Sequence, residues 1–191
     1  MSFYVIKQDT LIEGSVALDG VPDTIDPSDW LLGKVLPAPP QPLTLPLSIS
    51  SGKYYGSMIN SFLPLVHASL KNCLEQFGVD NIQYFPVNLI DQNGLVPNEK
   101  LAGVYYLANI IGRLDCVDLQ KSKVNYWPSQ RGYDLLSTVI DETKTNGQKI
   151  FRIKDDPTLI IINEELKQHL VDELNLLVGV EVIKTEDYSR W

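Results

Sequence analysis

The fold is decided by residues 147–185, which read GQKIFRIKDDPTLIIINEELKQHLVDELNLLVGVEVIKT. Polar and apolar residues alternate from Lys149 to Ile153, the pattern of a strand, and Asp155-Asp156-Pro157 supplies a turn. The apolar run from Leu159 to Ile162 is rich in β-branched residues and predicts a strand that is buried on both faces. This part of the stretch predicts a scaffold and contains no set of residues typical of an active site.

The rest of the stretch predicts a helix and a final strand. Asn163 can cap the helix, and Gly179 stops it before a strand from Val180 to Lys184. Leucines at spacings of three and four residues form the apolar face of this helix: Leu166, Leu170, Leu174 and Leu177.

A similar unit lies upstream. We expect a first helix that begins at Asn60, with Ser61 as its cap and Pro64 near its first turn. A strand then runs from Ile82 to Ile90, and Pro86 marks an edge or a bulge in it. The apolar face of this first helix has the same spacing as that of the second: Leu63, Val66, Leu70, Leu74 and Phe77.

Further strands are expected at Phe3 to Lys7, near Leu136 to Ile140, and over the longer run from Val104 to Leu119, where Gly112 marks a bend. The short connections favour antiparallel pairing. The sequence therefore predicts an α+β fold, with a mainly antiparallel sheet and two principal helices packed on it, in a single domain over residues 1–191.

The composition is that of an acidic globular protein. Of the 191 residues, 44% are hydrophobic and 21% are charged, and the formal net charge is −8. This balance argues against global disorder and disfavours nucleic acid as a partner, because affinity for nucleic acid depends on clustered Lys and Arg. No apolar run reaches the ~18 residues of a membrane span, and the first ten residues do not resemble a secretory signal. We therefore expect a cytoplasmic protein without a membrane partner.

The acid excess is concentrated near the N-terminus. Residues 8–33 contain six carboxylates and neither Lys nor Arg. Such a segment is either a solvated, loop-rich surface or an electrostatic patch for a cationic protein. Trp30 lies beside Asp29, and an aromatic residue in an acidic loop is typical of an interface hot spot. The candidate partner-binding residues are Asp19, Asp23, Asp26, Asp29 and Trp30.

A proline-rich run follows, with five prolines between Pro37 and Pro46. This density excludes a helix or a central strand and favours an extended segment that crosses the surface of the domain. A proline-rich ligand for an aromatic groove is the alternative.

The sequence offers little catalytic chemistry. His67 falls at the margin of the first helix's apolar face, and His169 lies among acidic residues on the polar side of the second helix, where a solvated charge network is expected. No zinc, calcium or phosphate-binding motif is present, so we expect no metal and no cofactor.

Cys73 and Cys116 each lie in an apolar pattern, which favours buried free thiols. Asp115 and Asp118 fall on opposite faces of a predicted strand and do not form a catalytic pair. Seven aromatic residues are expected in the core or as cross-strand partners, with binding anchors as the alternative: Tyr54, Tyr55, Tyr105, Tyr106, Tyr126, Trp127 and Tyr133. We predict that the protein is not an enzyme.

Three motifs resemble a bacterial family that was first catalogued as a domain of unknown function and later named after a myxobacterial immunity protein. The motifs appear here as Pro86-Val87, as Asn109 with Leu114-Asp115 and Asp118, and as Phe151-Arg152 with Asn163, Glu164 and Leu166. The resemblance covers residues 60–185, the expected α+β core, whereas residues 1–59 form a variable acidic and proline-rich part.

The resemblance implies a non-catalytic immunity protein of a polymorphic-toxin system, which binds and blocks a cognate toxin, often a nuclease. The acid excess fits a cationic toxin, which would be inhibited either by direct occlusion or through an exosite. The alternative is a scaffold or adaptor domain without a toxin partner, and a third possibility is a small hydrolase that uses one of the two cysteines.

Overall fold

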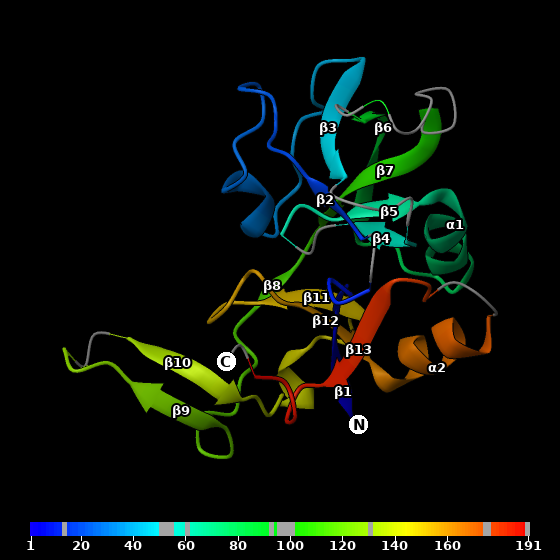
Figure 1. The fold of residues 1–191 in the computed structure, drawn as a ribbon. Coiled ribbons are helices and arrows are strands. Elements are labelled where there is room, and N and C mark those ends of the chain that lie inside the picture. Colours follow the sequence, from blue (N-terminus) through cyan, green and yellow to red (C-terminus); the bar gives the residue numbers. More distant parts are fainter. Residues whose placement is uncertain are drawn as a thin grey trace.

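The structure is a computed structural model of the 191-residue chain, and it describes residues 1–12, 15–49, 56–59, 62–91, 94, 102–129, 132–173 and 177–189. These residues form two larger sheets, a two-stranded arm and two α-helices (Figure 1). The α+β class predicted from the sequence is confirmed.

The five-stranded sheet has the order β13-β1-β12-β11-β8. All its pairings are antiparallel except that of β8 with β11. Helix α2 (Glu164–Asp172) follows β12 directly and packs on β12 and β1. The strands of this sheet are β1 (Phe3–Gln8), β8 (Arg113–Leu114), β11 (Ile150–Ile153), β12 (Ile160–Asn163) and β13 (Val180–Lys184).

The six-stranded sheet has the order β2-β3-β6-β7-β5-β4, and only β3 and β6 pair in parallel. Helix α1 (Ala68–Gln76) packs on β5 and β7. The strands are β2 (Val16–Leu18), β3 (Leu43–Ile49), β4 (Met58–Ile59), β5 (Leu65–His67), β6 (Ile82–Asp91) and β7 (Ala102–Ile110). The arm consists of β9 (Lys123–Tyr126) and β10 (Tyr133–Ser137), and two short 3-10 helices are η1 (Asp29–Leu31) and η3 (Glu142–Lys144).

The stretch from 147 to 185 folds largely as predicted. The Asn163 side chain accepts a hydrogen bond from the Leu166 N–H at 2.9 Å and caps α2. Strand β12 is buried on both faces, because all four of its residues are buried. Gly179 has a φ of 68°, a conformation that favours glycine, directly before β13. Leu174, one of the predicted stripe residues, lies outside the described residues.

The first helix was predicted to begin too early. Leu65–His67 form strand β5, paired with β7, and α1 begins only at Ala68. Its cap is His67, whose ring nitrogen Nδ1 accepts from the Ser69 N–H at 3.2 Å. Leu63 and Val66 have helical spacing, but Val66 is buried within β5 and Leu63 is buried in the bend before it, so tertiary pairing overrides the local pattern. The predicted cap Ser61 lies outside the described part of the chain.

The proline-rich run also differs from the prediction, because Pro46 lies within a central strand. Strand β3 sits between β2 and β6 and buries Leu45 and Leu47 completely. The Pro46 carbonyl accepts from the Asp19 N–H at 2.9 Å, just after β2 ends at Leu18. The N–H and C=O of one residue point to the same side of a strand, so the nitrogen of Pro46 also faces the end of β2. The lack of an N–H at Pro46 therefore removes no hydrogen bond between β3 and β6.

Pro86 likewise lies in a central strand, since β6 is flanked by β3 and β7. The register shifts between Val87 and Asn88, directly after this proline. The strand is therefore irregular one residue beyond the proline, and the predicted edge position was wrong.

Two other predicted strands are shorter or shifted. The run from Val104 to Leu119 divides at Gly112, which has a φ of 117°, into β7 and β8. The strand expected near Leu136 to Ile140 is β10, which ends at Ser137, and Ile140 forms only an isolated bridge with Val117.

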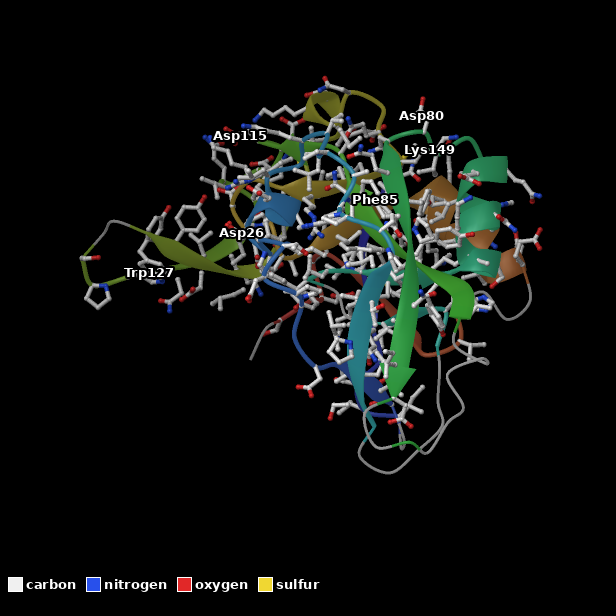
Figure 2. All side chains as sticks on the ribbon, turned by 90° about the horizontal axis from the view of Figure 1, so that it is seen from above. Asp26, Asp80, Phe85, Asp115, Trp127 and Lys149 are labelled. Carbon is white, nitrogen blue, oxygen red and sulfur yellow. The ribbon has the colours of Figure 1, made fainter. Side chains whose placement is uncertain are left out.

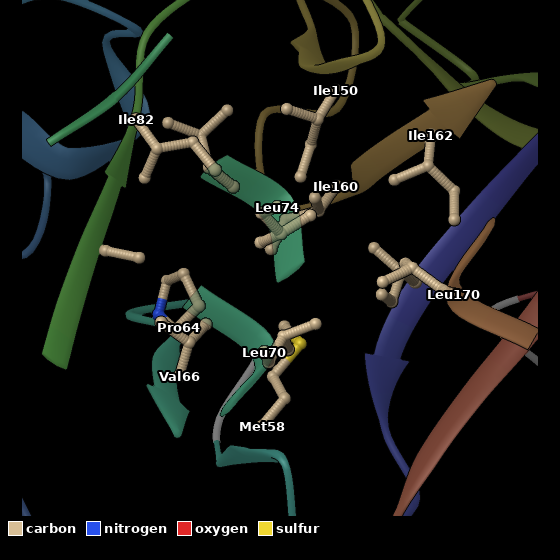
Figure 3. A pocket seen from close by; sticks show the side chains of 13 residues that line it. Met58, Pro64, Val66, Leu70, Leu74, Ile82, Ile150, Ile160, Ile162 and Leu170 are labelled. Carbon is tan, nitrogen blue, oxygen red and sulfur yellow. The ribbon is translucent and has the colours of Figure 1, made fainter. Parts of the chain in front are cut away.

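The two helices pack on different sheets, not on one sheet as predicted, but they share a core. Figure 1 shows α1 and α2 on the same side of the molecule. Leu70 and Leu74 of α1 and Leu166 and Leu170 of α2 belong to one buried cluster with residues of both sheets. A cavity of about 20 Å³ lies within this cluster, and all thirteen residues around it are apolar (Figure 3). A space so small and so apolar is a packing defect of the core and offers no ligand a polar contact.

Candidate partner-binding surface

The acidic segment is folded around a short turn that buries one of its residues. The carboxylate Oδ1 of Asp26 accepts hydrogen bonds from the Ser28 N–H at 2.9 Å and from the Ser28 hydroxyl at 2.7 Å. Helix η1 follows, and its Trp30 is only 4% exposed. The Trp30 ring packs edge-on against Phe85 of β6, with 5.6 Å between ring centroids. Trp30 therefore belongs to the core, and the expectation of an aromatic anchor on the surface is wrong for this side chain.

Four aspartates that were predicted to bind a partner have the opposite placement, because all four side chains are exposed. We call Asp19, Asp23, Asp26 and Asp29 the acidic surface. Within the described chain, no Lys or Arg side chain forms a salt bridge with any of these four carboxylates. The hydroxyl and then the N–H of Ser28 hold the pKa of the Asp26 carboxyl below its usual value, so this group stays negative at neutral pH.

The segment that follows η1 is anchored to the six-stranded sheet by amide side chains. Gln83 of β6 accepts from the Leu36 N–H at 2.8 Å and donates to the Leu36 carbonyl at 3.0 Å. Asn109 of β7, the register partner of Gln83, donates to the Lys34 carbonyl at 2.8 Å. The two side chains also bond to each other at 2.8 Å. These contacts fix the backbone on the C-terminal side of η1.

A close approach of two glycines completes this anchor. The Gly33 carbonyl accepts from the Gly112 N–H at 2.9 Å, and a Cβ on Gly33 would lie 2.6 Å from the backbone nitrogen of Arg113. Only glycine fits such a contact, and its φ of 65° also favours glycine. The bend between β7 and β8 thus holds the end of the acidic turn.

Asn109 is one of the motif residues, and its position explains why the motif contains an amide. Its side chain is completely buried and links the sheet to the N-terminal segment. Gln83 was missed, because a polar residue that alternates along a strand is usually solvent-facing. No local signal pairs it with a backbone 47 residues upstream.

A groove lies beside the acidic surface and has a volume of about 160 Å³. Asp26 and Asp29 contribute its acidic wall, and Pro37 and Pro39 belong to its apolar wall. The sequence predicted an acidic patch and a proline-rich surface segment separately, and the structure brings the two together.

The motif residue Arg152 has a structural role. Its side chain is completely buried in β11, and the guanidinium donates to the carbonyls of Pro157 at 2.7 Å and Phe62 at 3.1 Å. Burial lowers the pKa of this group to about 10, which leaves it charged at neutral pH. Arg152 therefore tethers the segment at Phe62 to the five-stranded sheet, and the polar face predicted for β11 is absent.

The thiols and histidines do not form a nucleophilic site. Cys73 and Cys116 are free and buried, as predicted, and burial raises the pKa of Cys116 to about 12 and also raises that of Cys73. A thiol that stays protonated is a weak nucleophile. The His169 ring stacks on Phe77 with 4.3 Å between centroids and thus joins the two helices, which corrects its expected place in a solvated network. The structure lends no support to a cysteine hydrolase.

The remaining acidic motif residues pair with different lysines. Asp115 forms a salt bridge with Lys154 at 2.7 Å, and Asp118 forms one with Lys121 at 2.9 Å. They follow β8 in a connection and are not on a strand as expected, yet they do not form a carboxylate pair. Across the described residues, no three His, Cys, Asp or Glu side chains are grouped so as to hold a metal ion. No helix in the same part of the chain is long and apolar enough to span a membrane.

Comparison with known proteins places this arrangement in a family. The sequence model of the immunity protein family (Imm11) matches residues 24–187, and no curated protein matches the chain. The match begins at residue 24 and includes Asp26, Asp29 and the proline-rich run, so it extends further upstream than the resemblance over residues 60–185. Immunity proteins neutralise toxins and are typically non-catalytic, in agreement with the prediction that the protein is not an enzyme. The chain therefore belongs to the Imm11 immunity protein family.

Proposed function

We propose that this protein neutralises a cationic cognate toxin in the cytoplasm by binding it through the acidic surface. The observation that carries the proposal is the placement of Asp19, Asp23, Asp26 and Asp29, all exposed and without salt bridges to the described Lys and Arg residues. The anchors at Gly33 and Gln83 support it, because a fixed charge array loses little entropy on binding.

The net charge of −8 supports a cationic partner. Opposite charges on two proteins accelerate their encounter and exclude partners of the same sign. A toxin that acts on nucleic acid carries clustered Lys and Arg to bind phosphates. A nuclease is therefore the toxin class that we propose, and the link to the family named after the myxobacterial protein is part of the same proposal.

The groove beside the acidic surface fits one residue type in particular. A Lys or Arg side chain has an aliphatic stem and a cationic head. The stem can lie against Pro37 and Pro39, while the head reaches Asp26 or Asp29. This pairing gives the acidic surface specificity beyond its net charge.

Co-expression with the product of the neighbouring open reading frame tests the proposal. The wild-type protein is expected to rescue growth and to bind that product tightly. A variant with Asp19, Asp23, Asp26 and Asp29 all changed to Asn should bind at least about 100-fold more weakly, which is 2.7 kcal/mol over four charges. The matched control changes Asp80, Glu165, Asp172 and Glu173, four exposed acids elsewhere, to their amides.

The control variant removes the same charge and should retain binding within a few-fold. Equal losses in the two variants would show that only net charge matters and would refute the acidic surface as the contact. Failure of the wild-type protein to bind or rescue would refute toxin neutralisation. Toxin activity on a minimal substrate, measured in the complex, distinguishes direct occlusion from exosite binding. Occlusion blocks this activity, whereas exosite binding leaves it intact.

A further inference from the structure

The β9–β10 arm projects from the body of the molecule (Figure 1). Among the described strands, its two strands pair with each other and with no third, and Tyr126 lies opposite Tyr133. An isolated two-stranded hairpin is marginally stable in water, so the contacts that hold this arm are informative.

Those contacts are made by aromatic side chains. The Trp127 indole N–H donates to the Asp134 carboxylate at 3.0 Å, and the backbone N–H of Trp127 donates to the Gly132 carbonyl at 3.0 Å. A Cβ on Gly132 would lie 2.6 Å from the indole ring, so only glycine lets the ring rest on this backbone. The Tyr126 and Tyr133 rings pack edge-to-face, with 5.7 Å between centroids.

Two of these rings remain open to solvent despite being fixed in place. Trp127 is 48% exposed and Tyr126 is 60% exposed. The sequence had predicted core or cross-strand roles for both, and only the cross-strand role of Tyr126 holds. Exposed Trp and Tyr side chains in a fixed conformation are the residues that most often dominate binding energy at protein interfaces.

The chemistry around the rings favours a cationic side chain. The Tyr133 hydroxyl donates to Asp155 in the same way as the Trp127 indole donates to Asp134. Neither carboxylate forms a salt bridge with a Lys or Arg of the described chain. The face of an indole ring attracts cations, and a carboxylate beside it strengthens the negative potential there.

The arm and the acidic surface lie toward the same side of the molecule. Figure 2 shows Asp26 and Trp127 on that side, and Figure 1, in a view turned by 90°, shows η1 and the arm on the same side. One partner can therefore contact both.

Resting on the proposed function, we propose that the β9–β10 arm is a second contact for the same cationic toxin, in which Trp127 stacks on an Arg or Lys side chain of the toxin. The acidic surface attracts the partner, and the arm supplies a desolvated aromatic contact that slows its dissociation.

The test measures the affinity and dissociation rate of the toxin from the neighbouring open reading frame for arm variants of the full chain. Trp127→Ala should weaken binding at least about 10-fold, mainly through faster dissociation. Trp127→Leu should bind as weakly as Trp127→Ala, because it lacks the aromatic face. Asp134→Asn keeps an acceptor for the indole and should weaken binding by a few-fold. The control is Val171→Ala, an equally exposed apolar residue (49%) on α2, which should bind as the wild-type protein does.

Retained binding by Trp127→Ala, together with a loss in the acidic-surface variant, would overturn the arm contact and leave the proposed function intact. Wild-type affinity of Trp127→Leu for the toxin would overturn the proposal that Trp127 stacks on a cationic side chain. No binding by the wild-type protein would overturn the proposed function and the arm contact together. The unfolding midpoint of each variant, measured in urea, confirms that the exposed substitutions leave the fold intact.

Discussion

Charged residues have opposite environments in the five-stranded sheet and in the acidic segment. Arg152 is completely buried, and its guanidinium is bound to two backbone carbonyls. Asp26 and its three acidic neighbours are exposed and make no salt bridge within the described residues. The first arrangement stabilises the chain, and the second leaves charge available to another molecule. Substitutions in the two regions should therefore affect different measurements.

The largest expected effect on stability is that of Arg152→Ala. Loss of two charge-assisted hydrogen bonds, at about 1.5 kcal/mol each, should lower the free energy of unfolding by about 3 kcal/mol. Urea unfolding measures this change. The control Arg113→Ala removes an exposed guanidinium with one hydrogen bond and should change stability by less than about 0.5 kcal/mol. Equal effects of the two variants would contradict the contrast between buried and exposed charge.

Gln83→Ala should have the next largest effect on the free energy of unfolding, and it should also disturb the acidic segment. It removes the two hydrogen bonds to Leu36 and the one to Asn109, for a cost of about 2 kcal/mol. Amide hydrogen exchange at Leu36 should accelerate, and toxin binding should weaken as the acidic segment loses its anchor. Gln168→Ala, on the exposed face of α2, is the control. Unchanged exchange at Leu36 would show that the segment is held by other contacts.

A smaller effect is expected at the cap of α2. Asn163→Ala leaves the Leu166 N–H without its side-chain partner and should cost about 1 kcal/mol. Asn163→Ser should lie within a few tenths of a kcal/mol of the wild-type protein, because serine caps as well as asparagine. Neither variant should alter toxin affinity. A loss of affinity in Asn163→Ala with an intact fold would remove the separation between the two regions.

The smallest stability effect is expected for Asp26→Asn, which keeps an acceptor for Ser28. The folded-state pKa of Asp26 is lowered, so its stabilising contribution is present above the unfolded value of about 3.9 and is lost as pH falls through the lower folded value. The unfolding midpoints of variant and wild type should therefore converge as the pH falls from above the unfolded value through the lowered folded pKa of Asp26. If the difference between the two unfolding midpoints grew on acidification, the pKa of Asp26 would be raised on folding and not lowered.

The parts of the fold that were predicted correctly depend on neighbours in the sequence. Asn163 caps a helix that begins at the next residue, and Gly179 directly precedes β13. The parts that were predicted wrongly depend on distant partners. Leu65–His67 become a strand because β7 pairs with them, and Trp30 is buried because Phe85 lies against it.

Prediction of the candidate surface was limited in the same way, by contacts between residues that are distant in sequence. The four exposed aspartates could be chosen from charge alone, because a carboxylate without a cation nearby in sequence is usually solvated. Gln83 and Trp127 could not be chosen from the sequence. Gln83 is a polar strand residue whose side chain binds the backbone of Leu36, and Trp127 is an aromatic residue that stays exposed. Alternation along a strand identifies two faces but does not say what covers each of them.

The position of β1 constrains when the five-stranded sheet can form during synthesis. This strand lies between β12 and β13, and Phe3 pairs with Asn163 while Gln8 pairs with Val180. A nascent chain shorter than about residue 163 thus offers β1 neither neighbour, and contacts at such long separation in sequence slow folding. The five-stranded sheet can therefore form around β1 only after β12 and β13, at residues 160–184, have been synthesised. The first strand to be synthesised is thus among the last to find its neighbours.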